Sequence, residues 1–233
     1  MTLLQEIQNA AVDSETSLAT LLRKCKLLAA RLESRKLEDW VAWESNGYPK
    51  DITVPEYRVW QLKVKGHFAG PFGSGIRNAS IPLSLIPEKG RKHYQHYECR
   101  QSIASIEAIL AHEEQSGTVY IDTGDLARAL GTNVYEHQNC LEAWAEFSAN
   151  HFVEVVNSVR NRILDFSLAI WKEAPTAGET EQSPGEQKLK TKKVTQIFNT
   201  TVYGGSANLV GTATESKVVF NIVTCLNFYT QLE

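Results

Sequence analysis

The chain has 233 residues, of which 42% are hydrophobic and 22% are charged, and its formal net charge is -3. These values are ordinary for a globular protein with a sizeable core, and the slightly negative charge argues against nucleic-acid binding over the whole surface. No stretch approaches the roughly 20 apolar residues of a membrane span, and the N-terminus lacks the layout of a secretory signal. We therefore expect a cytoplasmic protein without membrane contact.

The cysteines and histidines predict no metal site. Four cysteines are spread along the chain without a Cys-x-x-Cys pair, which indicates reduced, packed thiols. His93, His96 and Cys99 most resemble a ligand set, because spacings of three on a helix would place them on one face. That spacing fits no standard zinc signature, so a partly buried loop-to-helix segment is the favoured interpretation. We expect no metal and no cofactor.

The first 49 residues predict three helices. The first spans about Leu3 to Val12, and the third runs from about Lys36 to Glu44, before Gly47 and Pro49 stop it. The second is predicted to begin at an N-cap, Ser14, and to bury one face. Its apolar stripe consists of Leu18, Leu21, Leu22, Cys25, Leu28, Ala29 and Leu32.

A small strand layer is predicted next. Residues 57–65 (YRVWQLKVK) are rich in β-branched and aromatic side chains, which predicts a strand ending at Gly66. A second strand, residues 76–82, would pair back at a sheet edge. The glycine-rich loop between them could present N–H groups to a phosphate, but it lacks the Gly-Lys-Ser/Thr ending of a P-loop. A structural turn is favoured, with Phe68 and Phe72 folded onto the core.

Three further helices are predicted after the strands. Residues 102–112 and 125–130 carry short helical patterns, and residues 141–172 carry a long one that we expect to pack along the N-terminal helices. The long stripe has spacings of three and four and consists of Trp144, Phe147, His151, Val155, Val159, Ile163, Phe166 and Ile170.

The composition changes after residue 173. Residues 174–193 contain prolines, glycines, glutamates and lysines with little to bury, and predict a flexible linker. Residues 194–203, 206–210 and 217–224 predict short strands. The expected fold is therefore α+β and mainly α: a bundle-like helical domain (1–173) with a small hairpin or sheet insertion, a linker, and a β-rich tail (194–233).

The tail is predicted to mediate self-association. Because two or three short strands are rarely stable alone in water, we expect them to dock on the helical domain or to pair between chains. Pairing between chains is favoured, which makes the protein a homo-oligomer through residues 194–224. The residues assigned to this contact are Ile197, Phe198, Val202 and Tyr203.

Four residues are candidates for ligand binding. Arg160 and Arg162 lie on the predicted long helix, where the alternative is an ordinary salt-linked surface. Trp43 and Tyr48 could form an aromatic ligand face or anchor the strand layer to the helices, and core packing is the favoured interpretation. No catalytic motif stands out, so catalytic residues are unknown.

Several ordered strings resemble the AbiTii domain of bacterial abortive-infection proteins. They are residues 3–13 (LLQEIQNAAVD), 18–26 (LATLLRKCK), 40–44 (WVAWE), 46–49 (NGYP), 54–58 (VPEYR), 70–74 (GPFGS) and 159–166 (VRNRILDF). The resemblance covers about residues 1–173. It implies anti-phage defence, with the domain serving as a sensing, adaptor or regulatory module, and it transfers no catalytic residue.

Three functional hypotheses follow. The leading one is a non-enzymatic defence protein that recognises a phage or host protein and self-associates through its tail. The alternative is a toxin-like enzyme that acts on nucleic acid or nucleotide through Arg160, Arg162 or the region of His93. A nucleic-acid-binding module without chemistry is the third, and the composition does not indicate it.

Overall fold

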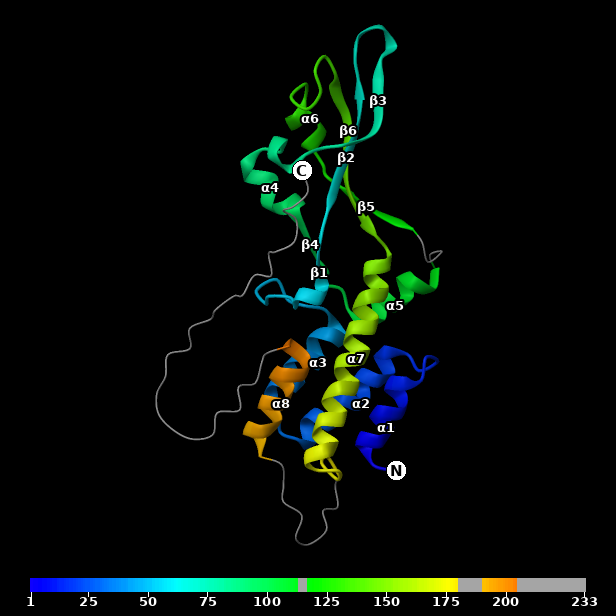
Figure 1. Cartoon of the computed structure of the whole chain (residues 1–233), viewed down its shortest axis with the longest axis vertical. Coiled ribbons are helices and arrows are strands. Elements are labelled where there is room, and N and C mark those ends of the chain that lie inside the picture. Colours follow the sequence, from blue (N-terminus) through cyan, green and yellow to red (C-terminus); the bar gives the residue numbers. More distant parts are fainter. Residues whose placement is uncertain (113–116, 180–189, 205–233) are drawn as a thin grey trace, which may run out of the picture.

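Two halves, one helical and one built on a sheet, follow each other along the long axis of the computed structural model (Figure 1). The structure describes residues 1–112, 117–179 and 190–204. The helical half contains α1 (Leu3–Val12), α2 (Leu18–Arg31), α3 (Arg35–Asn46), α7 (Asn150–Glu173) and α8 (Thr191–Tyr203). The other half holds a four-stranded antiparallel sheet, which confirms the predicted α+β class.

The N-terminal helices form as their sequences predict. The hydroxyl of Thr2 accepts a hydrogen bond from the backbone N–H of Gln5, and the Gln5 side chain accepts one from the N–H of Thr2, which closes a capping box at α1. The predicted apolar stripe of α2 is buried along its whole length. Its N-cap is Ser17 rather than Ser14, because the hydroxyl of Ser17 accepts from the N–H of Thr20.

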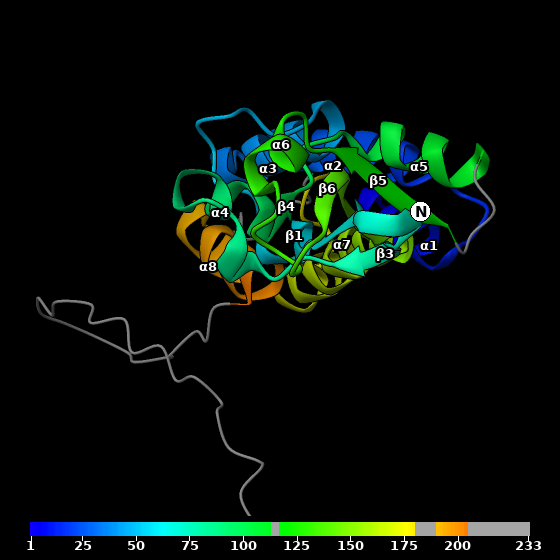
Figure 2. The same ribbon diagram turned by 90° about the horizontal axis from the view of Figure 1, so that it is seen from above.

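The predicted long helix is a strand followed by a helix. Residues Asn139–Ser148 form β6, and α7 begins only at Asn150. The spacing between Trp144 and Phe147 mimics a helical period, but β6 is held by hydrogen-bonded neighbours on both sides, a tertiary effect that local periodicity cannot report. From Asn150 onward the prediction is confirmed, and Figure 2 shows α1 and α8 on opposite sides of α7.

The four-stranded sheet has the order β3-β2-β6-β5. Its other strands are β2 (Lys63–Ala69), β3 (Gly75–Ser80) and β5 (Thr118–Asp122), and all neighbours are antiparallel. The single strand expected over 57–65 is instead a 3-10 turn (Glu56–Arg58), β1 (Val59–Gln61) and the start of β2. β2 continues through Gly66, where a Cβ would lie 2.5 Å from the carbonyl oxygen of Glu142.

Shorter elements complete the two halves. β1 pairs with β4 (His96–Glu98), while α4 (Glu88–Gln95) and α6 (Leu126–Leu130) lie on one side of the large sheet in Figure 1. The helices predicted over 102–112 and 125–130 are confirmed as α5 (Ile103–His112) and α6. Further 3-10 turns span Pro71–Gly73 and Leu83–Leu85.

The β2–β3 loop only partly follows its prediction. Phe68 is buried as expected, with 3% of its surface exposed. Phe72 lies fully exposed at the tip of the loop with a φ of 55°, so the expectation that it folds onto the core is wrong. The hairpin of β2 and β3 projects from the end of the sheet half (Figure 1), away from the core that this ring was expected to join.

Residues 194–203 are helical, so the strand prediction for them is wrong. They belong to α8, which packs on α7 and α3. Val194, Ile197, Phe198 and Val202 recur at spacings of three and four and are all buried within the chain. β-branched residues dominate this segment, but burial of a helical stripe against α7 outweighs their local preference for strands.

The linker is shorter than predicted on both sides. Ala177 is buried, and the carbonyl of Gly178 accepts a hydrogen bond from Arg31, so residues 174–179 dock on the helical half. At the other end Lys193 lies in α8 and pairs with Glu173 at 3.1 Å. The strands predicted over 206–210 and 217–224 lie outside the described residues, and no helix among those described is long and apolar enough to span a bilayer.

Candidate functional site at the junction of the two halves

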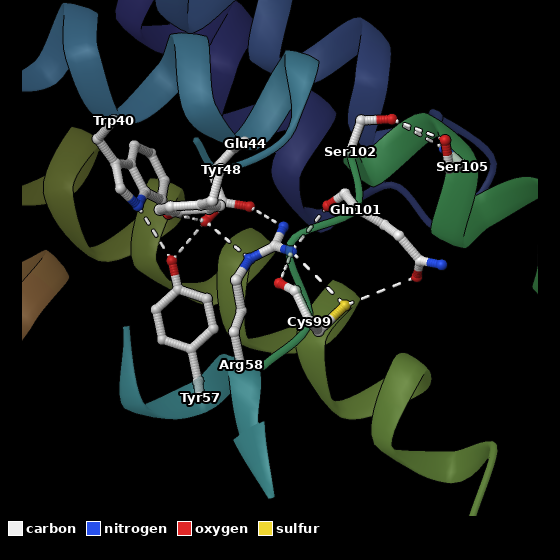
Figure 3. A network of polar contacts seen from close by, with 9 residues as sticks. All are labelled: Trp40, Glu44, Tyr48, Tyr57, Arg58, Cys99, Gln101, Ser102 and Ser105. Atoms are coloured by element: carbon white, nitrogen blue, oxygen red, sulfur yellow. Dashed lines mark hydrogen bonds and ion pairs between the residues drawn. The ribbon is translucent and has the colours of Figure 1, made fainter. Parts of the chain in front are cut away.

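A fully buried ion pair joins the helical half to the sheet half. Glu44 comes from the last turn of α3, and Arg58 from the 3-10 turn that leads into β1 (Figure 3). Both side chains are 0% exposed. The Nη2 of Arg58 contacts Oε2 of Glu44 directly, and its Nε donates to Oε1 at 3.3 Å. Its Nη1 donates to the carbonyls of Cys99 (2.9 Å) and Gln101 (2.8 Å).

Aromatic side chains complete the set of hydrogen bonds around Glu44. The hydroxyls of Tyr48 and Tyr57 each donate to Oε1 of Glu44 at 2.6 Å. The indole Nε1 of Trp40 donates to the hydroxyl of Tyr57 at 3.0 Å. The guanidinium carbon of Arg58 lies 5.0 Å from the ring centroid of Tyr48. The buried charges are thus paired and hydrogen-bonded, as burial without large cost requires.

The electrostatics favour a charged pair between neutral phenols. Burial raises the pKa of Tyr48 and Tyr57 above the ordinary value, and the negative charge of Glu44 raises it further. Burial lowers the pKa of Arg58, but the charge and hydrogen bonds of Glu44 outweigh that effect and raise it overall. Both phenols therefore stay protonated and act as donors to the carboxylate.

Chain geometry around Gly47 holds this network in place. Gly47 ends α3 with a φ of +96°, and a Cβ there would lie 2.8 Å from the carbonyl of Arg100. The N–H of Tyr48 donates to that same carbonyl at 2.8 Å. The turn after α3 is therefore hydrogen-bonded to the segment between β4 and α5. Arg58 donates hydrogen bonds to carbonyls of this same segment.

Arg162 extends the junction to α8. Its guanidinium carbon lies 4.2 Å from the ring centroid of Tyr57, a cation–π contact. Its Nε donates to the carbonyl of Val202 at 2.8 Å, in the last turn of α8. One chain of contacts therefore runs from Arg58 through Glu44, Tyr57 and Arg162 to the end of α8. We call the side chains Trp40, Glu44, Tyr48, Tyr57, Arg58 and Arg162 the junction.

The other sequence-predicted site residues lie elsewhere or have packing roles. Arg160 donates to the carbonyls of Ala10 (3.1 Å), Asp13 (3.0 Å) and Thr16 (2.7 Å), and so closes the end of α1. Trp43 is half-buried with its ring centroid 5.9 Å from that of Tyr48, consistent with anchoring of the helices.

The metal-like cluster is not assembled. Cys99 is buried with its Sγ 3.8 Å from Nη1 of Arg58, whereas His93 and His96 are exposed. Among the residues that the structure describes, no group of three histidine, cysteine or acidic side chains could hold a metal ion. Burial raises the pKa of the thiols of Cys99 and, to about 12, Cys25, so both are poor metal ligands.

The Glu44–Arg58 pair was not predicted from the sequence, although the position of Glu44 gave one indication of it. Glu44 follows Trp40 and Val41 at spacings of four and three, on the face of α3 that is buried. A carboxylate on a buried helical face requires a cationic or donor partner. The partner itself, 14 residues away across a turn, could not be chosen from spacing.

Comparison with known proteins gives a family and no closer relative. No curated protein and no solved structure matches the chain. The AbiTii family model matches residues 2–196, which include the residues of the junction and the first part of α8. Membership in this family implies a role in abortive-infection defence against phage. The chain belongs to the AbiTii family.

Proposed function

We propose that this protein is a sensing or adaptor module of anti-phage defence, which recognises a phage or host component and self-associates through the segment after α8. The observation that carries the proposal is the junction, because it joins the sheet half, the helical half and the end of α8 through continuous contacts. An event at the sheet half that displaces Arg58 alters the contacts of Glu44 and Tyr57, and through Arg162 those of α8.

The burial of the junction suits a relay better than a reaction centre. Glu44 and Arg58 are 0% exposed, so a substrate has no access to them. Their hydrogen bonds are satisfied by protein groups from three segments, and a displaced partner would leave a charge unpaired at a cost of several kcal/mol. Such a network tends to switch between discrete arrangements rather than deform gradually.

We assign the proposed contact between copies to the segment after α8 rather than to α8 itself. Ile197, Phe198 and Val202 are buried on the side of α8 that packs on α7 and α3, so they are unavailable to a second copy while α8 is docked. Tyr203 is 49% exposed and lies where the following segment begins. The strand-like patterns of residues 206–210 and 217–224 then carry the proposed contacts between copies.

Light scattering tests the self-association directly. The full chain and a chain ending at residue 204 are compared at matched concentrations. We expect a multiple of the monomer mass for the full chain and the monomer mass for the shorter one. Equal monomer masses would remove the assembly role of the tail.

Phage plating tests the role of the junction in defence. Arg162→Ala removes the contacts to Tyr57 and Val202, whereas Arg128→Ala alters an arginine whose side chain is 85% exposed, and serves as the control. We expect protection to be lost with Arg162→Ala and kept with Arg128→Ala, at equal levels of folded protein. Full protection by folded Arg162→Ala would refute the relay.

The alternative, a toxin-like enzyme that acts on nucleic acid or nucleotide, loses two of its three candidate positions. Arg160 and Arg162 already donate to backbone carbonyls that hold α1 and α8. The third position, around His93, lies beside a cleft and leads to a separate proposal.

A further inference from the structure

A cleft of about 450 Å³ opens in the sheet half, between the α4–β4 segment and strands β5 and β6. Its volume falls within the roughly 300–1,000 Å³ of small-molecule sites. The apolar part of its lining comes from Leu62, Ile121 and Ala145. Lys92, His93 and His96 line it as well and are exposed. The cleft thus combines an apolar floor with a nitrogen-rich rim.

Two tyrosines give the cleft fixed aromatic walls. The ring of Tyr97 stacks on Phe147 at 4.9 Å and lies 5.4 Å from the ring of Trp60. The hydroxyl of Tyr94 donates to the carbonyl of Thr123 at 3.0 Å. Both rings are held by neighbours before any ligand arrives, which lowers the entropy cost of binding a flat ligand against them.

The rim favours anions. Among the described residues, Glu98 is the one carboxylate that lines the cleft, and its Oε2 accepts a hydrogen bond from Arg100 at 2.6 Å, which neutralises it. Within the described part of the chain, no carboxylate lies within ion-pair distance of Lys92, His93 or His96. A lysine and two imidazoles are therefore free to contact a negatively charged group.

We propose that this cleft binds a nucleoside phosphate, with the base against Tyr97 and the apolar floor and the phosphate at Lys92, His93 and His96. An apolar floor alone would suit many ligands, and a rim of one lysine and two imidazoles alone would suit any anion. Their combination within one small cleft selects a ligand that has a flat ring and a phosphate. A long nucleic acid is disfavoured, because the chain carries a net charge of -3 and the rim is small.

The cleft adjoins the junction. This inference rests on the proposed function, because it assigns the nucleotide as the trigger that the sensing module recognises. Residues His96–Glu98 form both β4 and a wall of the cleft. The next residue, Cys99, accepts a hydrogen bond from Arg58 through its carbonyl. A nucleotide that shifts β4 therefore acts one residue away from the buried ion pair.

Calorimetry with AMP, ATP, ribose 5-phosphate and inorganic phosphate tests the ligand class on the full chain. We expect AMP and ATP to bind more tightly than ribose 5-phosphate, which lacks the base, and more tightly than phosphate. Equal affinity for AMP and ribose 5-phosphate would overturn the aromatic part of the site. Absence of heat with AMP and ATP at millimolar concentrations would overturn the proposal as a whole.

Variants of α4 and β4 locate the site. Lys92→Ala and His96→Ala should each weaken AMP binding roughly tenfold or more, because each removes a hydrogen bond to the charged phosphate. Lys89→Ala is the matched control, because Lys89 is exposed on the same helix but does not line the cleft. Equal affinities for all three variants and the unaltered protein would place the ligand elsewhere and refute this site.

The two proposals fail in different ways. Nucleotide binding is measured on the full chain in the absence of phage and does not require the tail to self-associate. Binding of AMP by a full chain that is monomeric in light scattering would therefore refute self-association alone. Loss of binding in Lys92→Ala with full phage protection would refute the assignment of the nucleotide as the trigger.

Discussion

The junction and the open face of the sheet place similar groups together, yet differ in their exposure to water. At the junction Glu44 lies between Arg58 and two phenols, and both charged side chains are 0% exposed. On the sheet face Glu146 pairs with Lys65 at 2.7 Å and accepts a hydrogen bond from Trp144 at 3.0 Å. The side chain of Glu146 is 11% exposed and that of Lys65 is 23% exposed.

This difference decides what each pair can contribute. The side chains of Lys65 and Glu146 are 23% and 11% exposed, so water reaches this pair and can in part replace a lost partner. No water is available to replace Arg58 beside Glu44, so the loss of one partner leaves a bare charge in the interior. We therefore expect the partly exposed ion pair on the sheet to stabilise the fold less than the fully buried pair at the junction.

Replacement of Arg58 has the largest expected effect. Arg58→Met leaves Glu44 buried without its cation and should lower the free energy of unfolding by about 3–5 kcal/mol. Guanidinium denaturation measures the change. The double variant Glu44→Met/Arg58→Met should recover much of the loss, because no unpaired charge remains. A double variant as unstable as the sum of the two single ones would contradict coupling within the pair.

Truncation of Phe198 tests whether α8 belongs to the core. This side chain is fully buried, with its ring centroid 6.1 Å from those of Trp40 and Phe166. Phe198→Ala should lower the free energy of unfolding by about 3–5 kcal/mol. Thr200→Ala, on the exposed side of the same helix, should change it by less than about 0.5 kcal/mol. If Phe198 served contacts between copies instead, its truncation would lower the mass in light scattering and leave stability unchanged.

Arg160→Ala is expected to have an intermediate effect. It removes donors from two partly buried carbonyls, those of Ala10 and Thr16, and from the exposed carbonyl of Asp13, and should cost about 1–3 kcal/mol of stability. Hydrogen exchange should show faster opening of α1 than of α3. Arg128→Ala, whose ion-pair partner Asp125 is also mostly exposed, should leave both the stability and the exchange unchanged. Equal loss in the two variants would mean that Arg160 acts only as a surface charge.

The smallest effect is expected on the open sheet face. Burial raises the pKa of Glu146, but hydrogen bonds from Lys65 and Trp144 outweigh it, so its pKa lies below the ordinary value of 4.5. The pair therefore stabilises the fold above about pH 4.5, and this contribution is lost as the pH falls through the lowered pKa. Lys65→Ala should cost about 1 kcal/mol at pH 7, and this cost should shrink as the pH falls through the lowered pKa of Glu146. Denaturation at a series of pH values from 7 downward measures this cost, with the exposed Lys50→Ala as control. A cost that does not shrink as the pH falls would contradict the ionic origin.

Sequence patterns predicted the secondary structure correctly where the apolar spacing within one segment agrees with the structure that the segment adopts. The bounds of α1 and the buried stripe of α2 were predicted correctly, whereas the predicted N-cap of α2, Ser14, was wrong. The patterns failed for β6 and α8 in opposite directions. Apolar residues of β6 happened to follow a helical spacing, and the β-branched residues of α8 suggested a strand. In both segments the partner that decides the outcome lies outside the segment itself: it is β2 for β6 and α7 for α8.

The candidate site was only partly predictable for the same reason. Trp43 and Tyr48 were expected to connect helices with strands, and Tyr48 does lie in the junction. Arg162 was proposed as a binding residue without any indication that it stacks on Tyr57 or reaches Val202. The choice of Arg58 as the partner of Glu44 depends on how the chain turns after α3, which spacing does not encode.

The amino-acid sequence by itself determined the mixed α and β content, the buried faces of the first helices and the resemblance to the AbiTii family, because these depend on residues close together in the chain. Tertiary structure alone decided that residues 194–203 form a core helix and that Glu44, Arg58, Tyr57 and Arg162 meet at one place. Buried charges must find partners wherever the fold brings them, so their pairing is a property of the packed chain rather than of local pattern.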